Sequence, residues 1–200
     1  MSDSQRPRRA DAERNREAIL DAAMRCLSAN PRASVVEIAS EAGVGRVTMY
    51  GHFTSRAEVV EAAFARAMDR ADASLSGLDL EDDPFAALER LVVASWLIVG
   101  ELRLVLQAAE EALGHDAVRQ RHAEPLERVR RLVRRGRRSG AFRRDLPEGW
   151  LVACYYAVLH GAAEETRSGR LPDSHAAQVV VRTIESLFRP VTEPTPRKGR

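Results

Sequence analysis

The chain has few cysteines and lacks the common sequence motifs of enzymes and metal proteins. Only two cysteines occur in 200 residues, Cys26 and Cys154, and neither belongs to a Cys-x-x-Cys pair. Zinc and redox motifs are therefore absent. There is no Gly-x-Ser-x-Gly, no P-loop and no Rossmann fingerprint, so catalysis has no support in the sequence. His160 and Glu164 have the spacing of a metal pair, but a third ligand is not evident. We expect no enzyme, no cofactor and no metal.

A strong net charge and long hydrophobic runs are also missing. The net charge is only +2, so bulk charge does not point to nucleic acid. The longest nearly apolar run, Val92 to Val99, is too short to cross a bilayer. Residues 1–10 contain no apolar segment of a signal peptide. These observations predict a cytoplasmic globular protein without membrane contact.

The charge that is present is unevenly distributed. From Arg119 to Arg144 the sequence has eleven arginines and two acidic residues. One interpretation is a second nucleic-acid patch. The other is a solvated helix face, because Leu126, Val129, Leu132 and Val133 form an ordinary buried stripe between the arginines. We prefer the solvated face.

Residues 34–56 predict two short helices, a glycine turn and the start of a third helix. Ser34 followed by Glu37 is a capping box, which marks a helix start. Gly43 lies where a helix ends in a left-handed residue. A second helix follows from Arg46, and a further Ser-x-x-Glu box within residues 54–58 starts the third. A short helix, a turn with glycine and a second short helix form the helix-turn-helix layout.

The second of these helices carries side chains suited to a DNA major groove, whose width admits an α-helix. Arg46 can donate two hydrogen bonds to a guanine, and Val47 can touch a thymine methyl group. Three further side chains can reach phosphate oxygens: Thr48, Tyr50 and His52. The alternative is a three-helix packing unit without a DNA role, in which Tyr50, His52 and Phe53 only fill the core.

The series from Val44 to Phe53, followed by Arg56, resembles the TetR family of bacterial transcriptional regulators. The family pattern is roughly Gly-Val-Ser-x-x-Thr-Leu-Tyr-x-His-Phe, then a lysine at the start of the next helix. This chain departs from it in four places: Gly45 for Ser, Met49 for Leu, Gly51 for a larger residue and Arg56 for Lys. Gly51 weakens its helix by about 1 kcal/mol relative to alanine. We expect Ser34, Gly45 and Arg56 at the DNA interface, where Arg56 and the N–H groups of its helix hold a phosphate.

We expect an all-α fold with an N-terminal helix-turn-helix DNA-binding domain and a C-terminal helical domain for ligand binding and dimerisation. The expected parts are a flexible basic arm at 1–10, the DNA-binding domain at 11–56, the effector and dimerisation domain at 57–189 and a disordered tail at 190–200. Periodicity predicts helices over 56–74, 84–113 with a kink near Gly100, 116–139 with an interruption at Pro125, 147–167 and 173–189. The connection from Ser139 to Leu146 also resembles the family, less specifically.

The resemblance implies a homodimer that pairs through the last two helices and reads a palindromic double-stranded operator. The second domain is expected to enclose a mainly apolar pocket with a few polar anchors for an unidentified small molecule. The candidate lining residues are Trp96, Glu101, Phe142, Tyr155, Tyr156 and His160. We therefore expect a repressor that a small molecule releases from DNA. The alternative is a ligand-binding or scaffold protein of the same fold that has lost operator binding.

Overall fold

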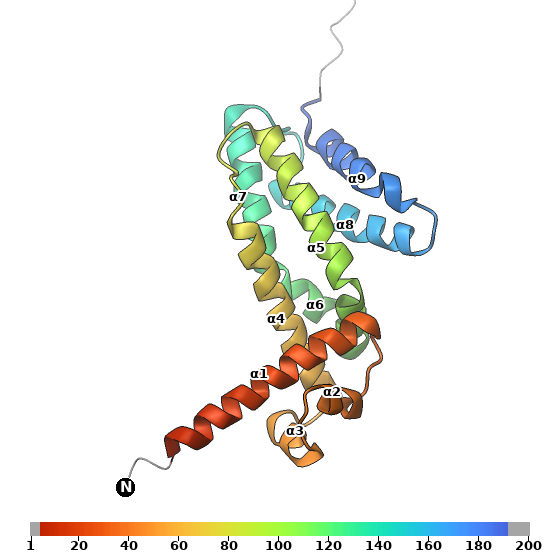
Figure 1. The fold of residues 1–200 in the computed structure, drawn as a ribbon. Coiled ribbons are helices and arrows are strands. Elements are labelled where there is room, and N and C mark those ends of the chain that lie inside the picture. The colour runs from red at the N-terminus through yellow and green to blue at the C-terminus, as the bar shows by residue number, and fades with distance from the viewer. Residues whose placement is uncertain (1–4, 192–200) are drawn as a thin grey trace, which may run out of the picture. The chain divides into compact units, whose positions relative to one another are not determined.

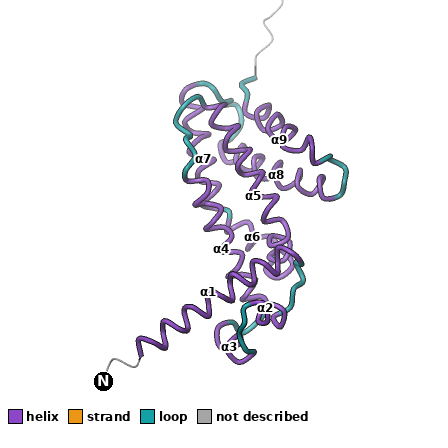
Figure 2. The backbone as a smooth tube through the Cα atoms, viewed as in Figure 1, coloured by secondary structure: helices purple, strands orange, loops and turns teal. Residues whose placement is uncertain are grey.

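The computed structural model describes residues 5–191, and all regular elements in that range are α-helices (Figure 1). Loops and turns join the helices, and the described residues contain no strand (Figure 2). The all-α prediction is confirmed. The helices are α1 (Gln5–Ala29), α2 (Val35–Glu41), α3 (Arg46–His52), α4 (Arg56–Ser76), α5 (Pro84–Leu113), α6 (His115–Arg121), α7 (Ala123–Ser139), α8 (Glu148–Arg167) and α9 (Asp173–Phe188).

The first of two compact units comprises the described residues up to Ser74 together with Gly100–Ala123. Its core is built from α1 to α4, the last turns of α5, and α6. The largest fully buried side chains include Ile19 and Leu27 from α1, Ile38 from α2, Met49 from α3 and Phe64 from α4. Helices α2 and α3 thus each insert one large apolar side chain into the core, and α1 and α4 supply most of the other buried residues.

The second unit comprises Leu75–Val99 together with the described residues from Glu124 onward. Its core joins the first half of α5 to α7, α8 and α9, and α8 packs directly against α9. Phe142 lies between the rings of Phe85 and Phe188, with centroid distances of 5.1 and 5.3 Å and edge-to-face geometry. Such pairs add about 0.5–1.5 kcal/mol beyond the burial of area.

Helix α1 begins at Gln5, so residues 5–10 form the first turns of a helix where we expected a flexible arm. Pro7 is compatible with this start, because the first four N–H groups of a helix have no intrahelical acceptor. At the other end, the disordered tail was predicted for residues 190–200, of which 192–200 lie outside the described residues.

Helix α5 runs unbroken through Gly100, so the segment is one helix and is not divided into two as expected. Glycine costs a helix about 1 kcal/mol, and the apolar faces on both sides of Gly100 outweigh this cost because each packs into a core. By length and composition alone, α5 could cross a membrane. Its buried residues, among them Leu88 and Leu91 in one core and Val105 in the other, make it a core helix.

The helical segment after Gly114 is interrupted at His122 and not at Pro125. Pro125 is the third residue of α7, where the missing N–H breaks no intrahelical bond. The other predicted helices agree with α4, α8 and α9 to within two residues. The two units do not follow the expected boundary at residue 56, because α4 up to Ser74 belongs with the first three helices. The functional domain limits stay a prediction.

Candidate nucleic-acid interface

Helix α2 begins with the capping box expected from the sequence. The backbone N–H of Glu37 donates to Ser34 Oγ at 3.2 Å, and the N–H of Ser34 donates to Glu37 Oε2 at 2.6 Å. Two N–H groups that the helix leaves without acceptors are thereby satisfied. The Ser34 hydroxyl, and then its backbone N–H, lower the pKa of the Glu37 carboxyl because both favour the ionised form. The first turn of α2 is thus held by neighbours in sequence.

The turn from α2 to α3 is a complete Schellman motif. Gly43 has a φ of +67°, in the left-handed region. The N–H of Val44 donates to Ala39 O at 3.0 Å, and the N–H of Gly43 donates to Ser40 O at 3.1 Å. Val44 then packs against the first core. This geometry sets the direction in which α3 leaves the turn.

Helix α3 has one buried and one exposed face. Met49 is fully buried, and Phe53, directly after the helix, is 2% exposed with the guanidinium of Arg16 over its ring. On the other face Val47 is 90% exposed and Tyr50 is 46% exposed, and Arg46 is exposed as well. A valine with so much exposed surface contributes little to packing, and its methyl groups are available to a partner.

The remaining predicted contacts on α3 are less open. Thr48 and His52 are half-buried, and Gly45 is the exposed residue before the helix, without a side-chain cap. The packing-only alternative required Tyr50, His52 and Phe53 all to fill the core, and of these only Phe53 is buried. That alternative therefore does not account for the exposed face.

Helix α4 begins with a cap that differs by one residue from the predicted box. The N–H of Glu58 donates to Ser55 Oγ at 3.2 Å, as expected. The Glu58 carboxylate, however, accepts from Thr54, from its N–H at 2.6 Å and its hydroxyl at 2.8 Å. The backbone N–H and then the hydroxyl of Thr54 lower the pKa of Glu58. This cap fixes the short connection between α3 and α4.

Arg56 has an internal partner that sequence reasoning missed. Its Nε donates to Ala33 O at 2.9 Å and its Nη2 donates to Pro31 O at 2.5 Å. The half-buried guanidinium therefore ties the start of α4 to the loop before α2. No local pattern signals this bond, because its partners lie 23 and 25 positions earlier in the chain. A phosphate contact by Arg56 stays a prediction.

The predicted ligand-binding aromatics divide into core residues and partly open ones. Phe142 is 1% exposed within its aromatic cluster, and Tyr155 is 2% exposed. The Tyr155 hydroxyl donates to Ser95 Oγ at 2.8 Å and lies 3.2 Å from Leu91 O. Burial raises the pKa of Tyr155, so it is a neutral hydrogen-bond donor. Both side chains have core roles in this structure.

Trp96, Tyr156 and His160 are the half-buried members of the predicted set. The rings of Tyr156 and His160 lie 4.2 Å apart on α8, and Trp96 packs against the second core. Glu101 is exposed and belongs to the first unit, not to the second. The structure thus brings Tyr156 and His160 together but does not join all six residues around one cavity.

Comparison with known proteins identifies what this geometry resembles. A family model described as "Bacterial regulatory proteins, tetR family" matches residues 19–63, which cover the C-terminal part of α1, all of α2 and α3 and the start of α4. The transcriptional repressor LfrR of Mycolicibacterium smegmatis is 27% identical over 174 residues, 87% of this chain and 90% of LfrR. The transcriptional regulator NfxB of Pseudomonas aeruginosa is 27% identical over 161 residues, 79% of this chain and 83% of NfxB.

The fold comparison agrees. A crystal structure of LfrR from Mycobacterium smegmatis in complex with proflavine superimposes with a TM-score of 0.66 at 26% identity. The match covers 90% of this chain and 98% of that one. The similarity therefore extends well beyond the helix-turn-helix, through both units.

Proposed function

This chain belongs to the TetR family of bacterial transcriptional regulators, and from that premise we propose that it is a repressor that binds a palindromic operator as a homodimer and is released by a small molecule. Family membership makes it a DNA-binding regulator and not an enzyme. The observation that carries the DNA contact is the exposed face of α3, with Val47 90% exposed above a buried Met49. The relative LfrR is named as a repressor, which supports the sign of regulation. Because the proposed operator is bacterial DNA, we propose that the protein is cytoplasmic.

A homodimer is supported by the outer surface of α8 and α9. Ala157 and Gly161 on α8 are small and exposed, and they permit close approach of a second backbone. Trp150 is 57% exposed and Val179 on α9 is 43% exposed. A single α3 reads few base pairs, whereas two copies about 34–36 Å apart read a palindrome in successive major grooves.

A small-molecule effector is supported by the half-buried aromatic side chains of the second unit and by a relative. LfrR is bound to proflavine in its crystal structure. We propose that Trp96, Tyr156 and His160 contact the effector of this chain. An effector that favours a different separation of the two α3 helices would weaken DNA binding by reciprocal coupling, typically about 1–3 kcal/mol.

The decisive experiment is DNA binding by the purified protein to the region upstream of its own gene, across a salt series. We expect protection of a palindrome and an affinity that falls steeply with salt, because phosphate contacts release counterions. If neither this region nor a genome-wide selection yields a site, operator binding is refuted. A ligand-binding or scaffold protein of the same fold is then the better assignment.

A further inference from the structure

The second unit contains a groove of about 640 Å³ that lies away from the predicted effector residues. Five arginines of α7 line it: Arg128, Arg131, Arg134, Arg135 and Arg138. The other wall is the end of α4 and the loop that follows, with the carboxylates of Asp79 and Glu81. The lining therefore has a clear excess of positive charge within a volume typical of small-molecule sites.

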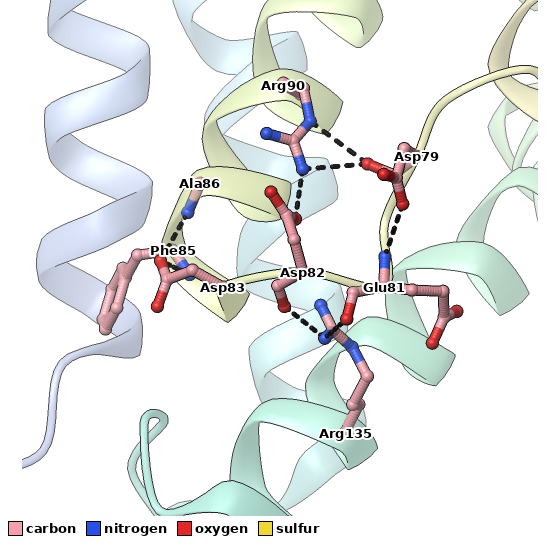
Figure 3. A network of polar contacts seen from close by, with 8 residues as sticks. All are labelled: Asp79, Glu81, Asp82, Asp83, Phe85, Ala86, Arg90 and Arg135. Carbon is pink, nitrogen blue, oxygen red and sulfur yellow. Dashed lines mark hydrogen bonds and ion pairs between the residues drawn. The ribbon is translucent and has the colours of Figure 1, made fainter.

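The loop wall is held in place by two arginines (Figure 3). Arg135 Nη1 donates to Glu81 O at 2.6 Å and also to the carbonyl of Asp82. Arg90 donates to Asp79 O through Nε at 3.1 Å and Nη2 at 2.9 Å, and it pairs with the carboxylate of Asp82. The loop is therefore fixed by hydrogen bonds from Arg90 on α5 and from Arg135 on α7 to its backbone carbonyls.

The arginines of the groove differ in how far their charge is already neutralised. Arg134 pairs with Glu148 at 3.0 Å and with Glu127 at 3.5 Å. Arg131 and Arg138 are exposed, and within the part of the chain that the structure describes they form no ion pair. These two guanidinium groups offer their donors to a ligand.

Arg135 also has a hydrogen-bond donor that lacks an acceptor in the part of the chain that the structure describes. Its Nη2 is buried and has no hydrogen-bond partner among the described residues. A buried donor without an acceptor costs about 1–3 kcal/mol, more for a charged group. Because Arg135 lines the groove, an anion whose entry shifts this side chain would supply that acceptor.

We propose that this groove binds a small organic phosphate. Arg131 and Arg138 would hold the phosphate by paired hydrogen bonds, for which the planar guanidinium is suited. The apolar part of the ligand would rest on Leu78 and Leu132, which line the same groove. Asp79 and Glu81 repel phosphates, so the phosphate of the ligand would lie on the α7 side of the groove. An extended nucleic-acid duplex is disfavoured, because its phosphates would also meet the loop wall.

The test is calorimetric titration of the full-length protein without DNA, with adenosine triphosphate, inorganic pyrophosphate and citrate as probes. We expect saturable binding of one adenosine triphosphate per chain and weaker binding of pyrophosphate, which lacks an apolar part. Arg131→Gln with Arg138→Gln should weaken both at least tenfold. No saturable binding of the two phosphates, or equally tight binding of citrate, would overturn the proposal.

The matched control is Arg103→Gln with Arg182→Gln, which removes the same charge from exposed positions outside the groove. We expect its affinity to remain within twofold of the unmodified chain, whereas an equal loss in both double variants would show only bulk electrostatic attraction. Arg131→Lys keeps the charge but removes the planar donor pair, and it should still weaken binding severalfold. If the double variant Arg131→Gln with Arg138→Gln instead bound non-operator duplex DNA less tightly, the groove would be assigned to nucleic acid. Because no operator enters the titration, its result is independent of the repressor proposal.

Discussion

At the scale of single residues, two glycines near α3 have opposite conformational requirements. Gly43 has a φ of +67° in the turn, where an added Cβ meets no neighbour but the backbone itself is strained for other residues. Gly51 lies within α3, in open space and without a positive φ. Space is available at both positions, so the backbone angle decides the effect of a substitution.

We therefore expect Gly43→Ala to lower the free energy of unfolding by about 1–2 kcal/mol. Gly51→Ala should raise it by about 0.5–1 kcal/mol, because alanine loses less backbone entropy in a helix. Urea denaturation of both variants measures the two changes, and each variant is the control for the other. Changes of the same sign would contradict the assigned backbone geometry.

Arg46 and Tyr50 are exposed on the same helix but should report different kinds of DNA contact. Arg46→Ala should lose about 1–3 kcal/mol of operator binding and relax specificity at one base pair. Tyr50→Phe removes a hydroxyl that reaches a phosphate, so it should weaken all sequences alike. Titration against operators altered at single positions separates the two. An equal loss on every sequence for Arg46→Ala would argue against base reading.

Gly136 on α7 is required by the aromatic cluster beside it. A Cβ at this position would lie 2.2 Å from Cδ2 of Phe142, whose ring is enclosed by Phe85 and Phe188. We expect Gly136→Ala to destabilise the second unit by about 1–3 kcal/mol through overpacking. Thermal unfolding measures this, with Gly149→Ala in open space on α8 as the control. Equal stability of the two variants would place the Phe142 ring elsewhere.

At the scale of elements, α2 and α4 each begin with a glutamate whose carboxylate accepts hydrogen bonds from a residue just before the helix. Hydrogen bonds from Ser34 lower the pKa of Glu37, and those from Thr54 lower the pKa of Glu58, each from an ordinary value of 4.5. A carboxyl with a lowered pKa in the folded state stabilises the fold above its unfolded pKa. This contribution is lost as the pH falls below about 4.5, through the folded pKa.

Glu37→Gln with Glu58→Gln should therefore flatten the dependence of unfolding free energy on pH between about 3 and 5. The difference from the unmodified chain should be largest near neutral pH and vanish in acid. Chemical denaturation at a series of pH values measures the slope. Ser34→Ala removes the hydroxyl that lowers the pKa of Glu37, so it should flatten the slope in part. An unchanged slope in these variants would exclude the caps as its source.

At the scale of the whole molecule, the proposed dimer surface can be tested without disturbing the core. Ala157→Arg and Gly161→Arg place a long charged side chain on the exposed face of α8, where an added Cβ at Gly161 meets open space. We expect both to shift the chain towards the monomer in sedimentation and to weaken operator binding. Gln120→Arg on α6 carries a similar side chain at another exposed site and should remain dimeric. A dimer in all three variants would move the interface elsewhere.

The sequence by itself determined the features whose partners are close along the chain. The box of Ser34 and Glu37, the left-handed Gly43 and the apolar stripes of α4, α8 and α9 depend on spacings of three to five residues. A helix repeats at that distance, so the pattern of residues shows the contact directly. For the same reason the helix-turn-helix and the exposed Arg46 and Val47 were predictable.

Only the tertiary structure decided the roles that depend on distant partners. Arg56 is tied to Pro31 and Ala33, Tyr155 to Ser95, and Arg135 to the loop at Glu81. Phe142 is in the core because Gly136 leaves room for its ring. An aromatic or an arginine on a helix has the same local pattern whether it fills a core, binds a loop or lines a groove. The choice among these depends on which other elements fold against it, and that packing brings together residues far apart in the chain.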